Sequence, residues 1–77
     1  MVQAYILVQT EVGKATEVAR LIGEIAGVTQ SEGVTGPYDV IVRAGAENMV
    51  DLGKLVETQI QAVAGITRTL TCPVVYV

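Results

Sequence analysis

Two polar side chains capable of chemistry follow a Gly-Pro step near the middle of the chain. Gly36 can adopt a positive φ, and Pro37 holds the φ that a turn requires at its first corner. Tyr38 and Asp39 come next. A phenol and a carboxylate in this position can line a pocket at a subunit boundary and hold a small polar ligand. Alternatively, Asp39 accepts hydrogen bonds from backbone N–H groups of the turn, and Tyr38 packs at the edge of a strand.

A second group of polar side chains lies near the C-terminus. Hydroxyls recur at every second position in Thr67, Thr69 and Thr71, so in a strand they share one face. Threonine forms strands well, which explains the pattern without a ligand. Hydroxyls beside the turn carboxylate can also bind the amino or carboxyl end of a metabolite. Arg43 and Arg68 can pair with carboxylates, more often as exposed partners than as ligand clamps.

The residues that common enzyme mechanisms use are missing. The chain has no His and a single Cys, which removes the usual general base and the usual zinc site. Neither a dinucleotide-binding G-x-G-x-x-G, nor a P-loop, nor a G-x-S-x-G occurs. Cys72 stands next to Pro73 among apolar residues, with no adjacent base or cation, and we expect it to be a small buried core residue. The sequence predicts no catalytic residue, no metal and no cofactor.

Composition sets the class of protein. The 77 residues are 51% hydrophobic and 17% charged, which predicts one folded domain spanning 1–77. So apolar a small chain is expected to bury surface against other copies of itself. A net charge of −3 argues against a nucleic-acid surface. The lone Cys, and the lack of a signal peptide or membrane-spanning run, predict a cytoplasmic protein without a membrane partner.

The first half of the chain reads as strand, helix and strand. Residues 2–10 alternate between two faces, one with Val2, Ala4, Ile6 and Val8 and the other with Gln3, Tyr5, Leu7 and Gln9. Residues 14–26 have apolar side chains at helical spacing, and Gly27 ends this helix as a C-terminal cap. Residues 28–35 form a more polar strand, which we place towards one edge of the sheet.

The second half repeats this order. A strand from Tyr38 or Asp39 to Ala44 precedes Asn48, which is typical of a helix N-cap with Asp51 as its partner. Gly65 ends the helix, and a last strand over 66–77 is bent or broken at Pro73. The apolar stripe predicted for this helix consists of Met49, Leu52, Leu55, Val56, Ile60 and Val63.

An internal repeat links the two halves. Ile-Ala-Gly-Val-Thr at 25–29 recurs as Val-Ala-Gly-Ile-Thr at 63–67, an offset of 38 residues, and apolar helix positions match at the same offset. Two βαβ units of this size predict an α+β, ferredoxin-like βαββαβ sandwich: a four-stranded antiparallel sheet with two helices on one face. The other face is left open, and we expect it to mediate dimerisation. Its predicted occupants are Tyr5, Leu7, Ile41, Thr67, Thr69 and Thr71.

These segments together resemble the effector-binding domain of the Lrp/AsnC family of leucine- and asparagine-responsive regulators. The similarity lies in Gly36-x-Tyr38-Asp39 followed by Val-Ile-Val, and in the run 64–71, Ala-Gly-Ile-Thr-Arg-Thr-Leu-Thr. It covers essentially the whole chain. Because the chain begins at the first strand, we expect a stand-alone version that lacks the helix-turn-helix of the family and does not bind DNA itself.

The resemblance implies a function for the domain. Family members dimerise through their sheets, and their dimers assemble into larger rings, commonly octamers, with amino acids bound at contacts between dimers. It implies effector-binding roles for Gly36, Tyr38 and Asp39, and for Thr69 and Thr71. The expected protein is a regulatory module linked to transcription that binds a small molecule, an amino acid, acts through homo-oligomer assembly, and can contact a full-length family regulator.

Two other functions fit the same fold. Cofactor-independent monooxygenases and related isomerases are dimeric α+β barrels, but they carry polar groups in a deep cavity between helices and sheet. The helix faces here supply only aliphatic side chains. A purely structural assembly module is the other alternative, and it would form an oligomer with no pocket at Tyr38 and Asp39.

Overall fold

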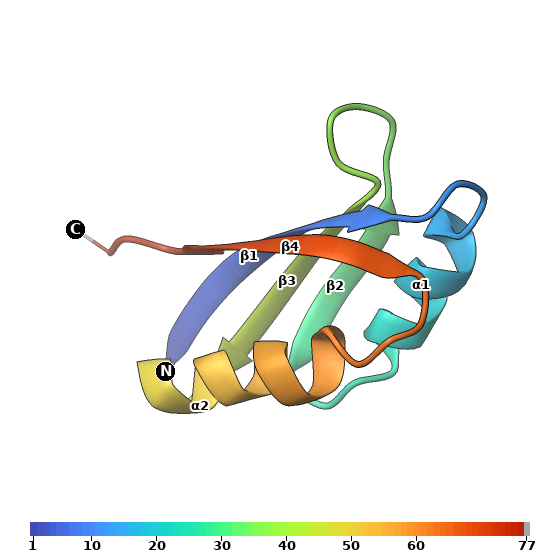
Figure 1. The fold of residues 1–77 in the computed structure, drawn as a ribbon. Helices are drawn as coiled ribbons and strands as arrows, with labels where there is room; N and C mark the ends of the chain where they lie inside the picture. Colours follow the sequence, from blue (N-terminus) through green and yellow to red (C-terminus); the bar gives the residue numbers. More distant parts are fainter. Residues whose placement is uncertain (77) are drawn as a thin grey trace.

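A four-stranded antiparallel sheet carries both helices on one face, as the computed structural model shows (Figure 1). The structure describes residues 1–76. The strand order is β2-β3-β1-β4, so β1 and β3 are central and β2 lies at an edge, as predicted. This is the predicted ferredoxin-like βαββαβ fold. The elements are β1 (Val2–Thr10), α1 (Ala15–Gly23), β2 (Val28–Gly33), β3 (Val40–Ala46), α2 (Met49–Leu55), its π-helical continuation η1 (Val56–Ile60) and β4 (Ile66–Pro73).

The core lies between the sheet and the helices, and it is aliphatic throughout. Alternate residues of the central strands point to this side, so their β-branched side chains pack against one stripe of each helix. No buried polar side chain occurs in the described part of the chain. The buried residues are Ala4, Ile6, Val8, Val40, Val42 and Ala44 from the sheet, with Val18, Ile22, Leu52, Val56 and Ile60 from the helices. Met49, predicted for the same stripe, is instead 52% exposed in the first turn of α2.

The helix ends follow from local chemistry. Asn48 is the N-cap of α2, and its side-chain oxygen accepts from the N–H of Asp51 at 2.9 Å. The first helix is shorter than predicted, because it ends at Gly23 and a further turn leads to Gly27. Gly27 and Gly65 have φ of +98° and +99°, which only glycine adopts without strain.

The repeat is visible in how the two halves hold each other. The carbonyl of Gly27 accepts from the N–H of Gly45, and the carbonyl of Gly65 accepts from the N–H of Glu11, both at 2.8 Å. Each glycine of one half therefore bonds to the other half.

The register of β4 corrects the predicted open face. Thr69 and Thr71 lie opposite the core residues Val8 and Ile6 of β1, so they share the helix-covered face. The alternate residues of β4 lie on the open face instead: Arg68, Leu70 and Cys72, with Leu70 and Cys72 opposite Leu7 and Tyr5. The predicted burial of Cys72 is likewise wrong, because its side chain is exposed.

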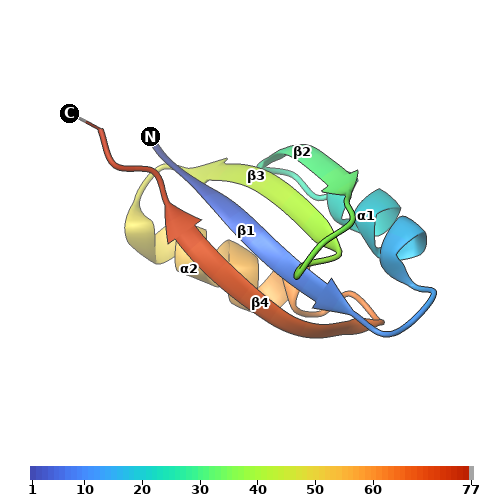
Figure 2. The same cartoon turned by 90° about the horizontal axis from the view of Figure 1, so that it is seen from above.

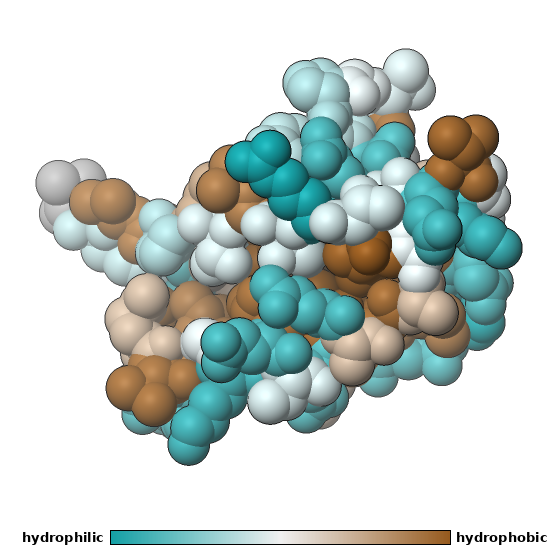
Figure 3. All heavy atoms as spheres, in the orientation of Figure 1, coloured by the Kyte–Doolittle hydropathy of each residue, from teal (hydrophilic) through white to brown (hydrophobic). Residues whose placement is uncertain are grey.

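The position of β4 in the sheet explains which of its residues lie on which face. It is an edge strand, and Figure 3 shows apolar side chains still visible in the seam between β4 and the second helix. An incompletely covered edge tolerates half-buried threonines, so alternation alone could not assign the faces. The strand ends at Pro73, which has no backbone N–H. An edge strand tolerates proline where the missing N–H would have pointed away from the sheet. The predicted strand therefore stops short of 77, a residue outside the described part.

No helix within residues 1–76 is long and apolar enough to cross a membrane.

Candidate functional site

Asp39 joins the central hairpin to the end of β1. Its Oδ2 accepts from the backbone N–H of Thr10 at 2.8 Å, and its own N–H donates to the carbonyl of Val8 at 2.9 Å. The carboxylate is half-buried there. Of the two interpretations, capping of backbone N–H groups is therefore seen, although the donor lies in β1 and not in the turn. The second carboxylate oxygen makes no hydrogen bond with the described residues.

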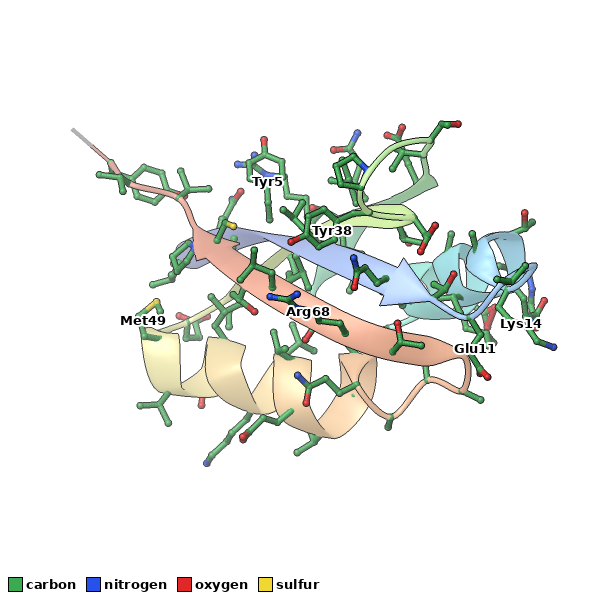
Figure 4. The ribbon with its side chains drawn as sticks, turned by 45° about the horizontal axis from the view of Figure 1, so that its top comes forward. Tyr5, Glu11, Lys14, Tyr38, Met49 and Arg68 are labelled. Carbon is green, nitrogen blue, oxygen red and sulfur yellow. The ribbon has the colours of Figure 1, made fainter. Side chains whose placement is uncertain are left out.

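The loop between β2 and β3 rises above the open face of the sheet (Figure 1). Gly36 at its tip is exposed with a φ of +148°, which confirms the predicted need for glycine. The carbonyl of Pro37 accepts from the side-chain amide of Gln9 at 3.1 Å, which ties the loop to β1. Figure 4 shows Tyr38 and Arg68 on the same, open side of the sheet, from the loop and from β4 respectively.

Thr69 and Thr71 do not meet this loop within one chain, because they lie on the helix-covered face. The hydroxyl of Thr69 accepts from the side-chain amide of Gln61 at 2.8 Å. Beside it is an open hollow of about 300 Å³ whose lining is mostly polar. The lining residues are Gln61, Ile66, Thr67, Arg68 and Thr69. The five predicted effector residues thus form two separate groups in the monomer.

Sequence reasoning missed a second hollow on the open face. It measures about 120 Å³, and its lining residues come from β2, β3 and β1 and from the loop after β2. Figure 2 shows these three strands side by side. Arg43 donates from Nε to the side-chain oxygen of Gln3 at 2.8 Å, donates to the hydroxyl of Tyr5, and stacks 4.9 Å above the Tyr5 ring. The available signal was the alternation of β1, which places Gln3 and Tyr5 on one face. The lining residues are Tyr5, Gln30, Glu32, Val34, Ile41 and Arg43.

Charge pairing is confined to the first helix. Arg20 contacts Glu17 at 2.7 Å and Glu24 at 2.8 Å, and these are the ion pairs within residues 1–76. The hydrogen bond and the charge of Arg20 lower the pKa of Glu17, and Glu17 in turn raises the pKa of Arg20. All three side chains are exposed, so this network belongs to a solvated helix face. The described residues hold no cluster of three or more His, Cys, Asp or Glu that could bind a metal.

A comparison with known protein families identifies the domain. The family model described as the Lrp/AsnC ligand-binding domain matches residues 3–76. The chain belongs to this family. The 77 residues hold the ligand-binding domain of the Lrp/AsnC regulators without a helix-turn-helix among them, as the resemblance implied.

Relatives by sequence are longer than this Lrp/AsnC domain. An uncharacterised HTH-type transcriptional regulator of Pyrococcus furiosus is 33% identical over 55 residues, which is 71% of this chain and 37% of the regulator. A homocitrate synthase of Sulfolobus acidocaldarius is 38% identical over 56 residues, which is 73% of this chain and 12% of the enzyme. The chain thus spans well under half the length of both relatives.

Solved structures give the same fold. The protein TTHA0845 of Thermus thermophilus superposes with a TM-score of 0.92 and 25% identity, covering 100% of this chain and 96% of that one. A transcriptional regulator of Neisseria meningitidis, solved as a complex with L-Met, has a TM-score of 0.84 and 21% identity, covering 97% of this chain and 50% of that one. At this identity the second likeness concerns the fold of the Lrp/AsnC domain alone.

Proposed function

We propose that this Lrp/AsnC domain is a regulatory module that binds an amino acid and acts through assembly of identical copies. The observation that carries the proposal is the match of the ligand-binding family model to residues 3–76. The complex of the Neisseria regulator with L-Met supports an amino acid as the ligand class. A cytoplasmic location, a link to transcription and the absence of direct DNA binding are parts of the same proposal. The net charge of −3 supports the last of these.

The open face of the sheet supports assembly as a dimer. Leu70, Ile41 and Tyr5 are 40%, 37% and 42% exposed there, and the helices cover only the opposite face. A contiguous apolar surface on a small soluble domain marks an interaction site. Two such sheets packed face to face would bury these side chains in a symmetric contact.

The effector site is proposed to form between copies. Gly36, Tyr38 and Asp39 rise on a loop, whereas Thr69 lies beside a separate hollow and Thr71 lies on the same helix-covered face. The two groups are not joined within one monomer, so a ligand that touches both must bridge two copies. We place the amino-acid site where the loop of one dimer reaches the hollow of another, in an assembly that can extend to an octamer.

Linkage between binding and assembly is the proposed mechanism. A ligand held between dimers stabilises the assembly that contains the better site, in proportion to its difference in affinity for the two states. No bond is made or broken. The output is a change in the population of oligomers, which a full-length regulator of the family can read by joining the assembly.

The enzyme alternative receives no support from the interior. The centre of the space between helices and sheet is filled by aliphatic side chains, and no polar side chain among the described residues is fully buried there. The homocitrate synthase shares only 12% of its length with this chain. A match to so short a part of the enzyme supports a similar domain attached to the synthase better than it supports a shared reaction.

Thermal unfolding against each of the twenty amino acids at millimolar concentration tests the proposal. A ligand at roughly one hundred times its dissociation constant stabilises the protein by about 2.7 kcal/mol, which raises Tm by several degrees. The stabilising amino acid should also shift the sedimentation distribution towards larger oligomers. Asp39→Asn and Thr69→Val should each abolish both responses, because they alter the two groups that the ligand bridges. If none of the twenty amino acids changes the Tm or the oligomer distribution of the wild-type protein, the sensor proposal is refuted and the structural assembly module is favoured.

A further inference from the structure

Arg43 is a fixed positive charge on the open face that has no carboxylate partner among the described residues. Its guanidinium is half-buried and held by the neutral groups of Gln3 and Tyr5, one a hydrogen-bonding amide and the other an aromatic ring with its hydroxyl. The ion pairs within residues 1–76 join Arg20 to Glu17 and Glu24 along the first helix, and none of them includes Arg43. A guanidinium held in position by neutral partners keeps its full attraction for a carboxylate.

Glu32 supplies the opposite charge at the same hollow. It lies on the open face of β2 opposite Ile41, it is exposed, and its carboxylate is contacted by the neutral side chain of Gln30 at 3.2 Å. Glu32 and Arg43 line one hollow but form no ion pair with each other within 4.0 Å. The hollow therefore presents one unpaired charge of each sign, next to the half-exposed apolar side chains of Val34 and Ile41.

Two-fold symmetry turns this arrangement into a complementary surface. In an isologous dimer, if residue i of one copy contacts residue j of its partner, then j of the first also contacts i of the partner. An unpaired Glu and an unpaired Arg close together on a self-associating face can thus satisfy each other twice across the axis. A partner of different composition would need to match both charges and the apolar surface around them separately.

We propose that Glu32 of one copy pairs with Arg43 of a second copy, and that these two reciprocal pairs align the sheets in the dimer. The occupant of the hollow is then the second copy of this chain, whose Glu32 completes the site around Arg43. This inference rests on the proposed face-to-face dimer and adds what determines its alignment. Apolar contacts through Leu70 and Ile41 bring the sheets together, and the charge pairs select one registration among the many that apolar contacts permit.

Charge reversal at the two positions tests the pairing. Glu32→Arg alone and Arg43→Glu alone each place like charges across the axis twice, and the dissociation constant of the dimer should rise on the order of 100-fold or more. Mixing the two variants in equal amounts should restore a dimer that contains one copy of each. One of its two pairs is then the native contact of Glu32 with Arg43, and the other is the same contact with both charges exchanged. Native mass spectrometry resolves this heterodimer by mass, and analytical ultracentrifugation gives its dissociation constant.

The mixture excludes simpler explanations. Each reversal changes the wild-type net charge of −3 by two, to −1 for Glu32→Arg and −5 for Arg43→Glu, so the overall charges of the two variants repel and cannot drive association. Pairing within one chain cannot explain a heterodimer, because each variant contains only one sign at the two positions. Glu57→Arg, an exposed reversal on η1, is the matched control and should leave the dimer unchanged.

Several results would overturn the pairing. Single reversals that dimerise as tightly as the wild type would do so, as would a mixture that stays as weak as its components. Should either variant not fold, Arg43→Gln replaces it: the wild-type dimer should weaken as salt rises, and this variant should lose that dependence. Leu70→Asp separates the two proposals. If it dissociates the dimer while charge reversal does nothing, the open face is an interface without the pairs; if it too does nothing, the face-to-face dimer is also wrong.

Discussion

Replacing Asp39 should destabilise the monomer as well as alter the proposed effector site. Its carboxylate accepts the N–H of Thr10 at 2.8 Å in a half-buried position, where the last residue of β1 leaves the sheet. Hydrogen bonds to charged acceptors contribute about 1.5–3 kcal/mol, and the partial exposure here places this one near the lower end. Asp39→Ala also leaves the N–H of Thr10 without its acceptor. We expect a loss of about 1–2 kcal/mol.

Urea unfolding followed by circular dichroism measures this loss directly. For a domain of this size, about 1–2 kcal/mol corresponds to a Tm lower by roughly 4–16 °C. Asp39→Asn keeps a side-chain oxygen and should lose less than half as much. The slope of free energy against urea should not change, because the same surface is exposed on unfolding. If Asp39→Ala is as stable as the wild type, the contact with Thr10 has no energetic role and the carboxylate is left with ligand binding alone. The asparagine variant is therefore the better choice for ligand experiments.

Three further changes test the packing, the turns and the helix face. Ile22→Ala should cost about 2–5 kcal/mol in chemical denaturation, because Ile22 is fully buried in the aliphatic core, and a smaller loss would mean that the core collapses around the gap. Gly65→Ala should destabilise more than Gly13→Ala in the same assay: both have positive φ, but a Cβ at Gly65 would lie 3.2 Å from a side chain of α1 whereas one at Gly13 meets nothing within 4 Å. Arg20→Gln should raise the pKa of Glu17, which carbon-detected NMR titration can follow. Because that pKa is lowered in the folded state, the Arg20 contact stabilises at neutral pH and its contribution disappears as pH falls below 4.5, so variant and wild type should converge in acid.

The order of the strands and helices could be predicted because local signals agree, although the π-helical form of η1 was not predicted. Alternation in β1, helical spacing in the two helices and glycines after them all point to one arrangement, and the 38-residue repeat then gives the topology. Element ends were less predictable. The first helix stops at Gly23 because the turn before Gly27 is held by its own hydrogen bonds, which propensity does not show.

The faces of β4 could not be assigned from sequence. Both of its sides carry small or mixed residues, and a shift of one position exchanges Thr69 and Thr71 with Leu70 and Cys72. Only pairing with β1, in which Thr69 lies opposite Val8, decides the matter. Because of this shift, the hydroxyls of Thr69 and Thr71 lie on the helix-covered face, opposite to the face above which the loop with Tyr38 rises. The Tyr5–Arg43 contact was also missed, because it depends on the register between two strands whose contacting residues lie 38 positions apart.

The strand order has a consequence for how this chain can be divided. β1 and β2 are separated by β3, and β3 and β4 are separated by β1, so neither half of the repeat contains a pair of neighbouring strands. A cut between Gly36 and Pro37, in the exposed loop, yields two fragments that each lack a hydrogen-bonded sheet. We expect both fragments to be unfolded alone and to reassemble only with one another, at a rate that depends on the concentration of both. We therefore expect no stable half-folded form of this domain. A fragment complementation assay should give a signal only when both fragments are present.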